Sequence, residues 1–126
     1  MHILLTTCCK EKDPAPGTLP AIKRYLSKRI AHVYDESITY NIPMRILSGK
    51  FGLLSPDAPI PNYDHPLSTM EVPMLLPHVM EQLDQDSISA ITFYAHPRQT
   101  PGWEPYYQVV EQSCKALSIK FEIEIV

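Results

Sequence analysis

The chain has 126 residues, of which 44% are hydrophobic and 20% are charged, and its formal net charge is −3. These values are ordinary for a globular domain, and no segment approaches the roughly 18 apolar residues that a membrane-spanning helix needs. The first residues also lack the basic and long apolar regions of a signal peptide. We therefore expect a cytoplasmic protein that forms a single domain over residues 1–126 and does not associate with membranes.

The charges are distributed unevenly along the chain. Residues 1–50 hold 8 basic and 4 acidic side chains, whereas residues 51–126 hold 3 basic and 10 acidic ones. A long nucleic acid requires a broad basic face, because each neutralised phosphate adds to the affinity. Only the N-terminal part offers such a face, and solvated helix surfaces explain the same charges at least as well.

The cysteines and histidines do not form a metal-binding pattern. Cys8, Cys9 and Cys114 are odd in number, and the histidines never recur at the spacing that places two ligands on one helix face. The glycine patterns of P-loop ATPases and of dinucleotide-binding dehydrogenases are missing as well. We expect reduced thiols, no bound metal and no cofactor.

Two strands are predicted in the first part of the chain, each followed by a polar loop. An apolar run over residues 2–7 predicts a buried strand, and residues 8–17 are too polar and proline-rich to continue it. A second apolar run over residues 44–47 predicts another strand. Because ligands bind at the carboxyl ends of strands in open α/β sheets, we expect both loops to open on one functional edge.

The pattern between these strands is helical. Thr18 is suited to cap a helix with Pro20 in its first turn, and apolar residues then recur at three- and four-residue steps as far as Ile38. One helix, or two helices joined near Ser27, fits this pattern. A basic cluster within it is more simply interpreted as a solvated helix face than as a phosphate-binding patch; its members are Lys23, Arg24, Lys28 and Arg29.

The second half of the chain continues the alternation of helices and strands. Ser68 or Thr69, together with Glu71, forms a capping box before an apolar stripe that ends at Leu83, and Pro77 within the stripe predicts a kink.

A third strand is predicted over residues 88–94 and a third helix from residues 101–105, with Cys114 as an inert core thiol. The alternating residues 120–126 predict an edge strand with one wet face. This order predicts an α/β fold with three layers, in which a mainly parallel, Rossmann-like sheet of four strands carries helices on both faces.

We expect the chemistry in residues 47–67. Gly49 and Gly52 stand beside Ser48 and Lys50, so the backbone is able to turn sharply and present amide groups to a small anionic ligand. The prolines between positions 56 and 66 disfavour both helix and central strand. Loops of about 20 residues without secondary structure are usually functional or disordered. The apolar residues in this stretch argue against disorder, which favours a functional loop.

This stretch resembles a known signature. Leu47-Ser48-Gly49-Lys50-Phe51-Gly52-Leu53-Leu54-Ser55-Pro56, with Ile60 and Tyr63, is similar to the Leu-Ser-Gly-x-Tyr-Gly-Leu-Leu-x-Pro pattern of the YaaA-type peroxide-stress proteins. The chain also resembles a group of small bacterial and phage domains of unknown function. Their three motifs are matched by Cys8-Cys9-Lys10 (or Lys12), Tyr25-Leu26-Ser27 and Pro61-Asn62-Tyr63-Asp64. The resemblance implies a common pocket and nucleic-acid or nucleobase chemistry.

Two functions fit these residues best. The first is an enzyme that cleaves or exchanges an N-glycosidic bond in a nucleotide or a nucleic acid. It needs a carboxylate near the sugar carbon, aromatic faces for the base and donors for phosphate. The second is a non-catalytic module that binds a nucleotide or nucleic acid through the same loop. A purely structural partner domain is a weaker third alternative.

For the enzyme we assign catalytic roles to Asp64, Tyr63 and Lys50. For Asp64, a structural role in an Asx turn explains the residue as well as catalysis does. For Tyr63, packing as a core aromatic is a somewhat better explanation than stacking on a base. Cys8 is interpreted as a buried structural cysteine in preference to a nucleophile beside Lys10 and His96. The residues assigned to ligand or phosphate binding are Cys8, Lys10, Ser48, Gly49, Phe51 and Gly52.

Overall fold

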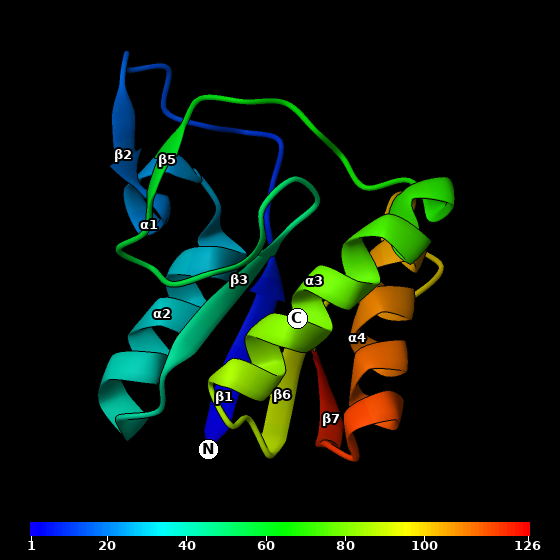
Figure 1. Cartoon of the computed structure of the whole chain (residues 1–126). Coiled ribbons are helices and arrows are strands. Elements are labelled where there is room, and N and C mark those ends of the chain that lie inside the picture. The colour runs from blue at the N-terminus through cyan, green and yellow to red at the C-terminus, as the bar shows by residue number, and fades with distance from the viewer.

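A computed structural model describes all 126 residues (Figure 1). The elements in chain order are β1 (His2–Thr7), β2 (Thr18–Pro20), α1 (Ala21–Arg24), α2 (Lys28–Tyr40), β3 (Met44–Ser48), β4 (Gly52–Leu54), β5 (Pro59–Pro61), the 3-10 turn η1 (Thr69–Glu71), α3 (Val72–Gln85), β6 (Ala90–Ala95), α4 (Glu104–Leu117) and β7 (Lys120–Ile125).

The central sheet has five strands, in the order β4-β3-β1-β6-β7, so the expected number of four is wrong. β1 pairs in parallel with β3 and β6, and β6 pairs in parallel with β7, which confirms a mainly parallel sheet. The additional strand β4 pairs antiparallel with β3. Its three residues are too few to give a periodic signal, and the hairpin forms because Gly52 adopts a φ of +74°, which favours glycine.

Helices cover both faces of this sheet, as predicted (Figure 1). α1 and α2 pack on one face in a cluster that includes Leu4 and Ile46. α3 and α4 pack on the other face against Ile3 and Phe93. Successive strand residues point to opposite faces, so the short apolar run of β1 contributes to both cores.

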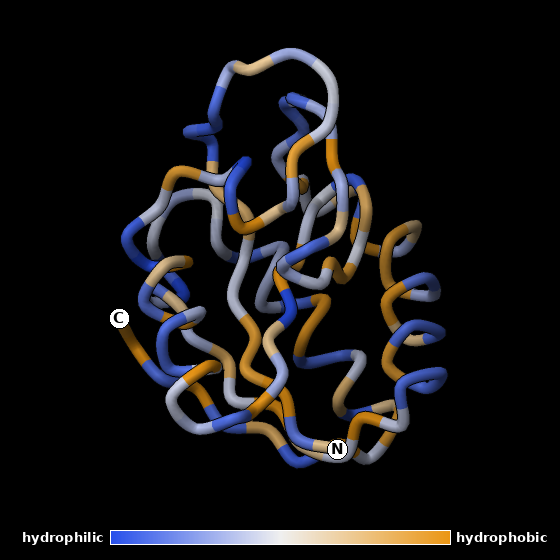
Figure 2. The backbone as a smooth tube through the Cα atoms, turned by 90° about the vertical axis from the view of Figure 1, so that its left-hand side faces the viewer, coloured by the Kyte–Doolittle hydropathy of each residue, from blue (hydrophilic) through white to orange (hydrophobic).

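Two segments pass above the carboxyl ends of β1 and β3, at the top of Figure 1. One follows β1, and the other connects β4 to α3. The antiparallel pair β2 and β5 joins them, with Leu19 opposite Ile60. In Figure 2 the orange stretches run mainly along the strands and helices, whereas these upper segments are largely blue or white. The segments at this end of the sheet are therefore more polar than the strands below them.

The helical region after β1 differs from its prediction at its start. Thr18 does not cap a helix, because it pairs with Pro61 in the small sheet and α1 begins only at Ala21. The alternative of two helices is confirmed, and Ser27 caps the second one through a hydrogen bond from the Ile30 N–H to its Oγ at 3.2 Å.

The basic cluster in these helices is only partly solvated. Lys23 and Lys28 are exposed, as expected, but Arg24 is completely buried and Arg29 is half-buried. The solvated-face interpretation is therefore wrong for both arginines. Each turns inward because its guanidinium has backbone carbonyls to bind: those of residues 13, 15 and 17 for Arg24, and that of Thr7 for Arg29.

The second half of the chain follows the prediction closely. The capping box is confirmed, with the Ser68 N–H donating to Glu71 Oε1 at 3.1 Å. α3 continues through Pro77 without a break. Cys114 is buried and β7 lies at the sheet edge, as expected. The prediction that β7 has one dry face is wrong, since Ile123 and Ile125 are exposed and only the start of the strand packs on the core.

Candidate active site

A cavity of about 290 Å³ lies between the loop that follows β1 and the segment that leads from β5 to α3. We call it the Asp64 cavity. It lies at the carboxyl end of β1, where ligands bind in open α/β sheets. Four of the residues predicted to form a site share it: Cys8, Lys10, Tyr63 and Asp64. Its other lining residues are Cys9, Lys12, His65, Pro66 and Tyr106.

Hydrogen bonds and ring contacts fix Tyr63 in the cavity wall. Its hydroxyl bonds to Tyr25 Oη and lies 2.7 Å from Ser48 Oγ. The Phe51 ring meets it edge-on, with the ring centroids 5.1 Å apart. Burial raises the pKa of Tyr63 to about 12, so the phenol stays protonated at neutral pH. It offers a rigid aromatic surface and is not a base.

Asp64 follows Tyr63 and is exposed to the cavity. Its carboxylate has no hydrogen-bond or ion-pair partner in the protein. The Asx-turn alternative is therefore not observed at this position, whereas Asp13 does form such a turn with the Ala15 N–H at 2.9 Å. Because no protein group binds the Asp64 carboxylate, it is available to interact with a ligand.

Two lysines supply positive charge to the same cavity. Lys12 Nζ donates to the Cys9 carbonyl at 2.9 Å and lies 4.8 Å from the centre of the Tyr63 ring. Lys10 is exposed, and its Nζ has no hydrogen-bond partner in the protein. The aromatic wall, the carboxylate and the ammonium groups thus come from two segments more than fifty residues apart.

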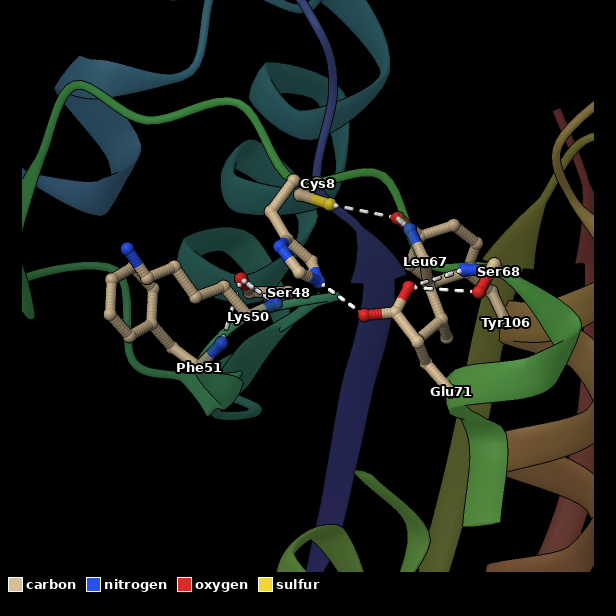
Figure 3. Close-up of polar contacts among 9 residues, drawn as sticks. Cys8, Ser48, Lys50, Phe51, Leu67, Ser68, Glu71 and Tyr106 are labelled. Atoms are coloured by element: carbon tan, nitrogen blue, oxygen red, sulfur yellow. Dashed lines mark hydrogen bonds and ion pairs between the residues drawn. The ribbon is translucent and has the colours of Figure 1, made fainter. Parts of the chain in front are cut away.

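Cys8 connects this cavity to α4 (Figure 3). Its Sγ lies 3.4 Å from the hydroxyl of Tyr106, which accepts a hydrogen bond from the Leu67 N–H at 3.1 Å. Cys8 is half-buried and remains accessible from the cavity. Cys9 beside it is a poor nucleophile at neutral pH, because burial raises the pKa of its thiol to about 11.

The turn from Ser48 to Gly52 has a structural role. Ser48 is completely buried, and its Oγ accepts hydrogen bonds from the N–H groups of Lys50 and Phe51, each at 3.1 Å (Figure 3). With both lone pairs engaged, its own hydrogen is directed to Tyr63. These amides therefore hold the turn and Tyr63 in place and are not available to a phosphate.

Gly49 is required by packing. A Cβ at this position would lie 2.7 Å from the His65 carbonyl oxygen and 2.9 Å from the Leu67 nitrogen. The segment that carries Asp64 and His65 therefore passes directly over the glycine. Its function is to let the two backbones approach closely.

Lys50 and Gly49 line an adjoining hollow of about 320 Å³ on the other side of His65. His65 Nε2 lies 2.7 Å from Glu71 Oε2. Hydrogen bonds from Ser68 and from His65 hold the pKa of Glu71 below its usual range. Of the residues predicted to form one site, Gly49 and Lys50 thus face this hollow, and Ser48, Phe51 and Gly52 line neither space.

Sequence reasoning missed several residues of the cavity wall. Tyr106 was missed because it lies on α4, far along the chain, and its spacing indicates only a core residue. The first motif, Cys8-Cys9-Lys10, indicates Lys12 only as an alternative to Lys10. His65 stands beside Asp64 in the predicted loop, but the capping box predicts only the contact between Ser68 and Glu71, so its pairing with Glu71 carries no sequence signal.

Comparisons with known proteins identify no relative. No family model, no curated protein and no solved structure matches this chain. No helix combines the length and the apolar composition needed to cross a membrane. No group of three or more His, Cys, Asp or Glu side chains is placed to hold a metal ion.

Proposed function

We propose that the protein is an enzyme that cleaves or exchanges the N-glycosidic bond of a nucleotide or nucleic acid in the Asp64 cavity. The observation that carries this proposal is the Asp64 carboxylate, which has no protein partner and shares a cavity with two lysines and two tyrosines. Cleavage of such a bond develops positive charge on the sugar carbon, and a nearby carboxylate stabilises that charge.

In hydrolysis, the bond between C1′ and the base nitrogen breaks as a bond from water oxygen to C1′ forms. Asp64 accepts the proton that the water loses, and a proton from the solvent goes to the nitrogen of the departing base; Asp64 then returns its proton to the solvent, so one water is consumed in total. In exchange, a second base replaces water as the nucleophile. Tyr63 and Tyr106 line the wall where the base packs, and Lys10 and Lys12 attract the negatively charged part of the substrate.

The cavity volume supports a small ligand. At about 290 Å³ it is close to the lower end of the range for small-molecule sites, which suits one nucleotide unit better than a long polymer. A nucleic acid would have to present a single unstacked nucleotide to it.

The test is to incubate the protein with nucleosides, nucleotides and single-stranded DNA and to detect released base by mass spectrometry. We expect base release by the wild type and its loss in Asp64→Asn, which keeps the side-chain volume and removes the negative charge. Asp57→Asn is the matched control, since Asp57 is exposed in the same segment and lines none of the cavities described here. It should retain full activity.

Labelled water and an added free base distinguish hydrolysis from exchange. In ¹⁸O-labelled water, hydrolysis places the label on the sugar, whereas exchange requires an added free base and leaves the sugar unlabelled. Ligand binding without any base release would contradict the enzyme and support the binding module instead. Equal base release by Asp64→Asn and the wild type would contradict the role of Asp64.

A further inference from the structure

A second space lies at the point where the strand order of the sheet reverses. The chain leaves β1 to form β3 on one side and later places β6 on the other, so the carboxyl ends of β1 and β6 diverge into different loops. Crevices at such points are the usual binding sites of open α/β sheets. Here a crevice of about 320 Å³ lies beside the Asp64 cavity, and we call it the Arg29 crevice.

Arg29 reaches into this crevice from the first turn of α2 and crosses the edge of the sheet. Its Nη1 donates to Thr6 Oγ1 at 2.5 Å and to the Thr7 carbonyl at 2.8 Å. Its guanidinium lies 4.9 Å from the centre of the Trp103 ring. Trp103 directly precedes α4, which packs on the face of the sheet opposite to α2. The arginine thus bridges the two helical layers over the end of β1.

The positive charge of Arg29 has no negative partner. All its hydrogen bonds go to neutral oxygens, and none of the ion pairs in the protein includes it. Arg29 is half-buried, and this desolvation lowers the pKa of its guanidinium. A half-buried cation without a carboxylate costs free energy that a bound anion would offset.

The free donors of Arg29 form the edge that binds oxyanions. Both Nη1 hydrogens are used, but Nε makes no hydrogen bond and Nη2 makes only a long one, of 3.4 Å, to the Cys8 carbonyl. The Nε and Nη2 hydrogens are parallel and match two oxygens of one phosphate or carboxylate.

The remaining wall also favours an anion. Lys10 and His96 line the crevice, and none of its ten lining residues is Asp or Glu. His96 packs against Trp103 with ring centroids 5.0 Å apart, and its Nδ1 lies 2.9 Å from the Val126 carbonyl oxygen. Because this oxygen only accepts, His96 Nδ1 carries the hydrogen of the contact, and the ring forms part of the crevice wall. Arg29 and Lys10 together carry two positive charges, which suit a doubly charged phosphate better than a singly charged carboxylate.

We propose that the Arg29 crevice is a phosphate-binding site, in which the guanidinium edge of Arg29 binds two phosphate oxygens and Lys10 supplies the second positive charge. The site does not depend on the reaction proposed for the Asp64 cavity. It does give that reaction a substrate class, because Cys8, Cys9, Lys10 and Tyr106 line both spaces. A nucleotide whose sugar and base occupy the Asp64 cavity would place its phosphate beside Arg29.

The single tryptophan of the chain makes the test direct. Trp103 is the only Trp and lines the crevice, so its fluorescence reports on binding there. We would titrate the protein with inorganic phosphate at constant ionic strength and, separately, with acetate. We expect a saturable change with phosphate at a Kd of about 1 mM or below, and much weaker binding of acetate.

Variants separate a specific site from general charge attraction. Arg29→Gln should raise the Kd for phosphate about tenfold or more, which is the loss expected for a charge-assisted hydrogen-bonded pair. Lys28→Gln is the matched control, since it removes one charge from the adjacent exposed residue and should leave the Kd unchanged. Asp64→Asn should still bind phosphate, so failure of the proposed reaction and failure of this site are distinguishable.

Three results would overturn the proposal: no saturable response of Trp103 to phosphate, an unchanged Kd in Arg29→Gln, or acetate binding as tight as that of phosphate. If Arg29→Gln does not fold, the wild type still gives an answer by nuclear magnetic resonance. Phosphate should then shift the Arg29 Nε–H and Trp103 indole resonances, and unshifted resonances would refute the site.

Discussion

Arg24 offers the sharpest test of how the fold supports the Asp64 cavity. It is completely buried without a carboxylate partner, and its guanidinium instead donates to the carbonyls of Asp13, Ala15 and Gly17 at 2.6, 2.9 and 2.7 Å. Weaker contacts reach Ile60 in β5. One side chain therefore ties the loop after β1, which holds Lys10 and Lys12, to the small sheet.

The perturbation is Arg24→Met, which keeps much of the side-chain length and removes every donor. Hydrogen bonds to a charged group contribute about 1.5 to 3 kcal/mol each, so the three short ones total about 5 to 9 kcal/mol. Removing the buried charge recovers several kcal/mol of desolvation. We expect a net loss of about 3 kcal/mol, which a domain stable by about 5 to 15 kcal/mol survives.

The assay is urea unfolding followed by circular dichroism. Arg98→Met is the matched control, because Arg98 is an exposed arginine whose partners are Glu104 and Glu111 on the surface. Exposed ion pairs contribute little, so this variant should lose much less stability than Arg24→Met. An Arg24→Met loss below about 1 kcal/mol would refute the reasoning, since it would mean that water satisfies the three carbonyls equally well.

Two further predictions follow from packing and from a buried thiol. Gly49→Ala should lower the free energy of unfolding by about 1 to 3 kcal/mol, because its Cβ would meet the backbone of residues 65–67. Unfolding in urea checks this, and a neutral or stabilised variant would contradict it. Burial raises the pKa of Cys114 from 9.0 to about 11, so the unfolded chain loses its thiol proton first and stability falls as the pH rises through this window. The fall between pH 8 and 11 should be smaller by about 2 to 3 kcal/mol in Cys114→Ala than in the wild type, and equal falls would disprove the assignment.

The sequence predicted the main layout of the fold because local patterns encode it. The apolar run of β1, the capping box at Ser68 and the helical spacing around Cys114 each depend on neighbours within a few residues. Periodicity and capping report such local preferences well. The strand–helix alternation and the mainly parallel sheet follow from them, whereas β4 was missed because three residues carry no period.

The sequence also indicated where polar residues gather, but not which of them face a ligand. Motif spacing grouped Ser48 and Gly49 with Asp64, yet the structure uses the Ser48 hydroxyl to hold Tyr63 and Gly49 to admit the backbone of His65. Whether a side chain points inward depends on partners far along the chain. The local sequence pattern does not encode which distant groups a side chain will contact.

The local pattern of residues 1–126 thus determined the long strands and helices, their order and the edge of the sheet where loops collect, but not the three-residue strands β2, β4 and β5. Only the tertiary structure decided that Arg24 is a buried support and that Arg29 is a cation without a counter-charge beside Trp103. Both arginines belong to one basic cluster in the sequence. Their roles differ because hydrogen bonding and burial depend on which distant carbonyls and rings the fold brings to each guanidinium.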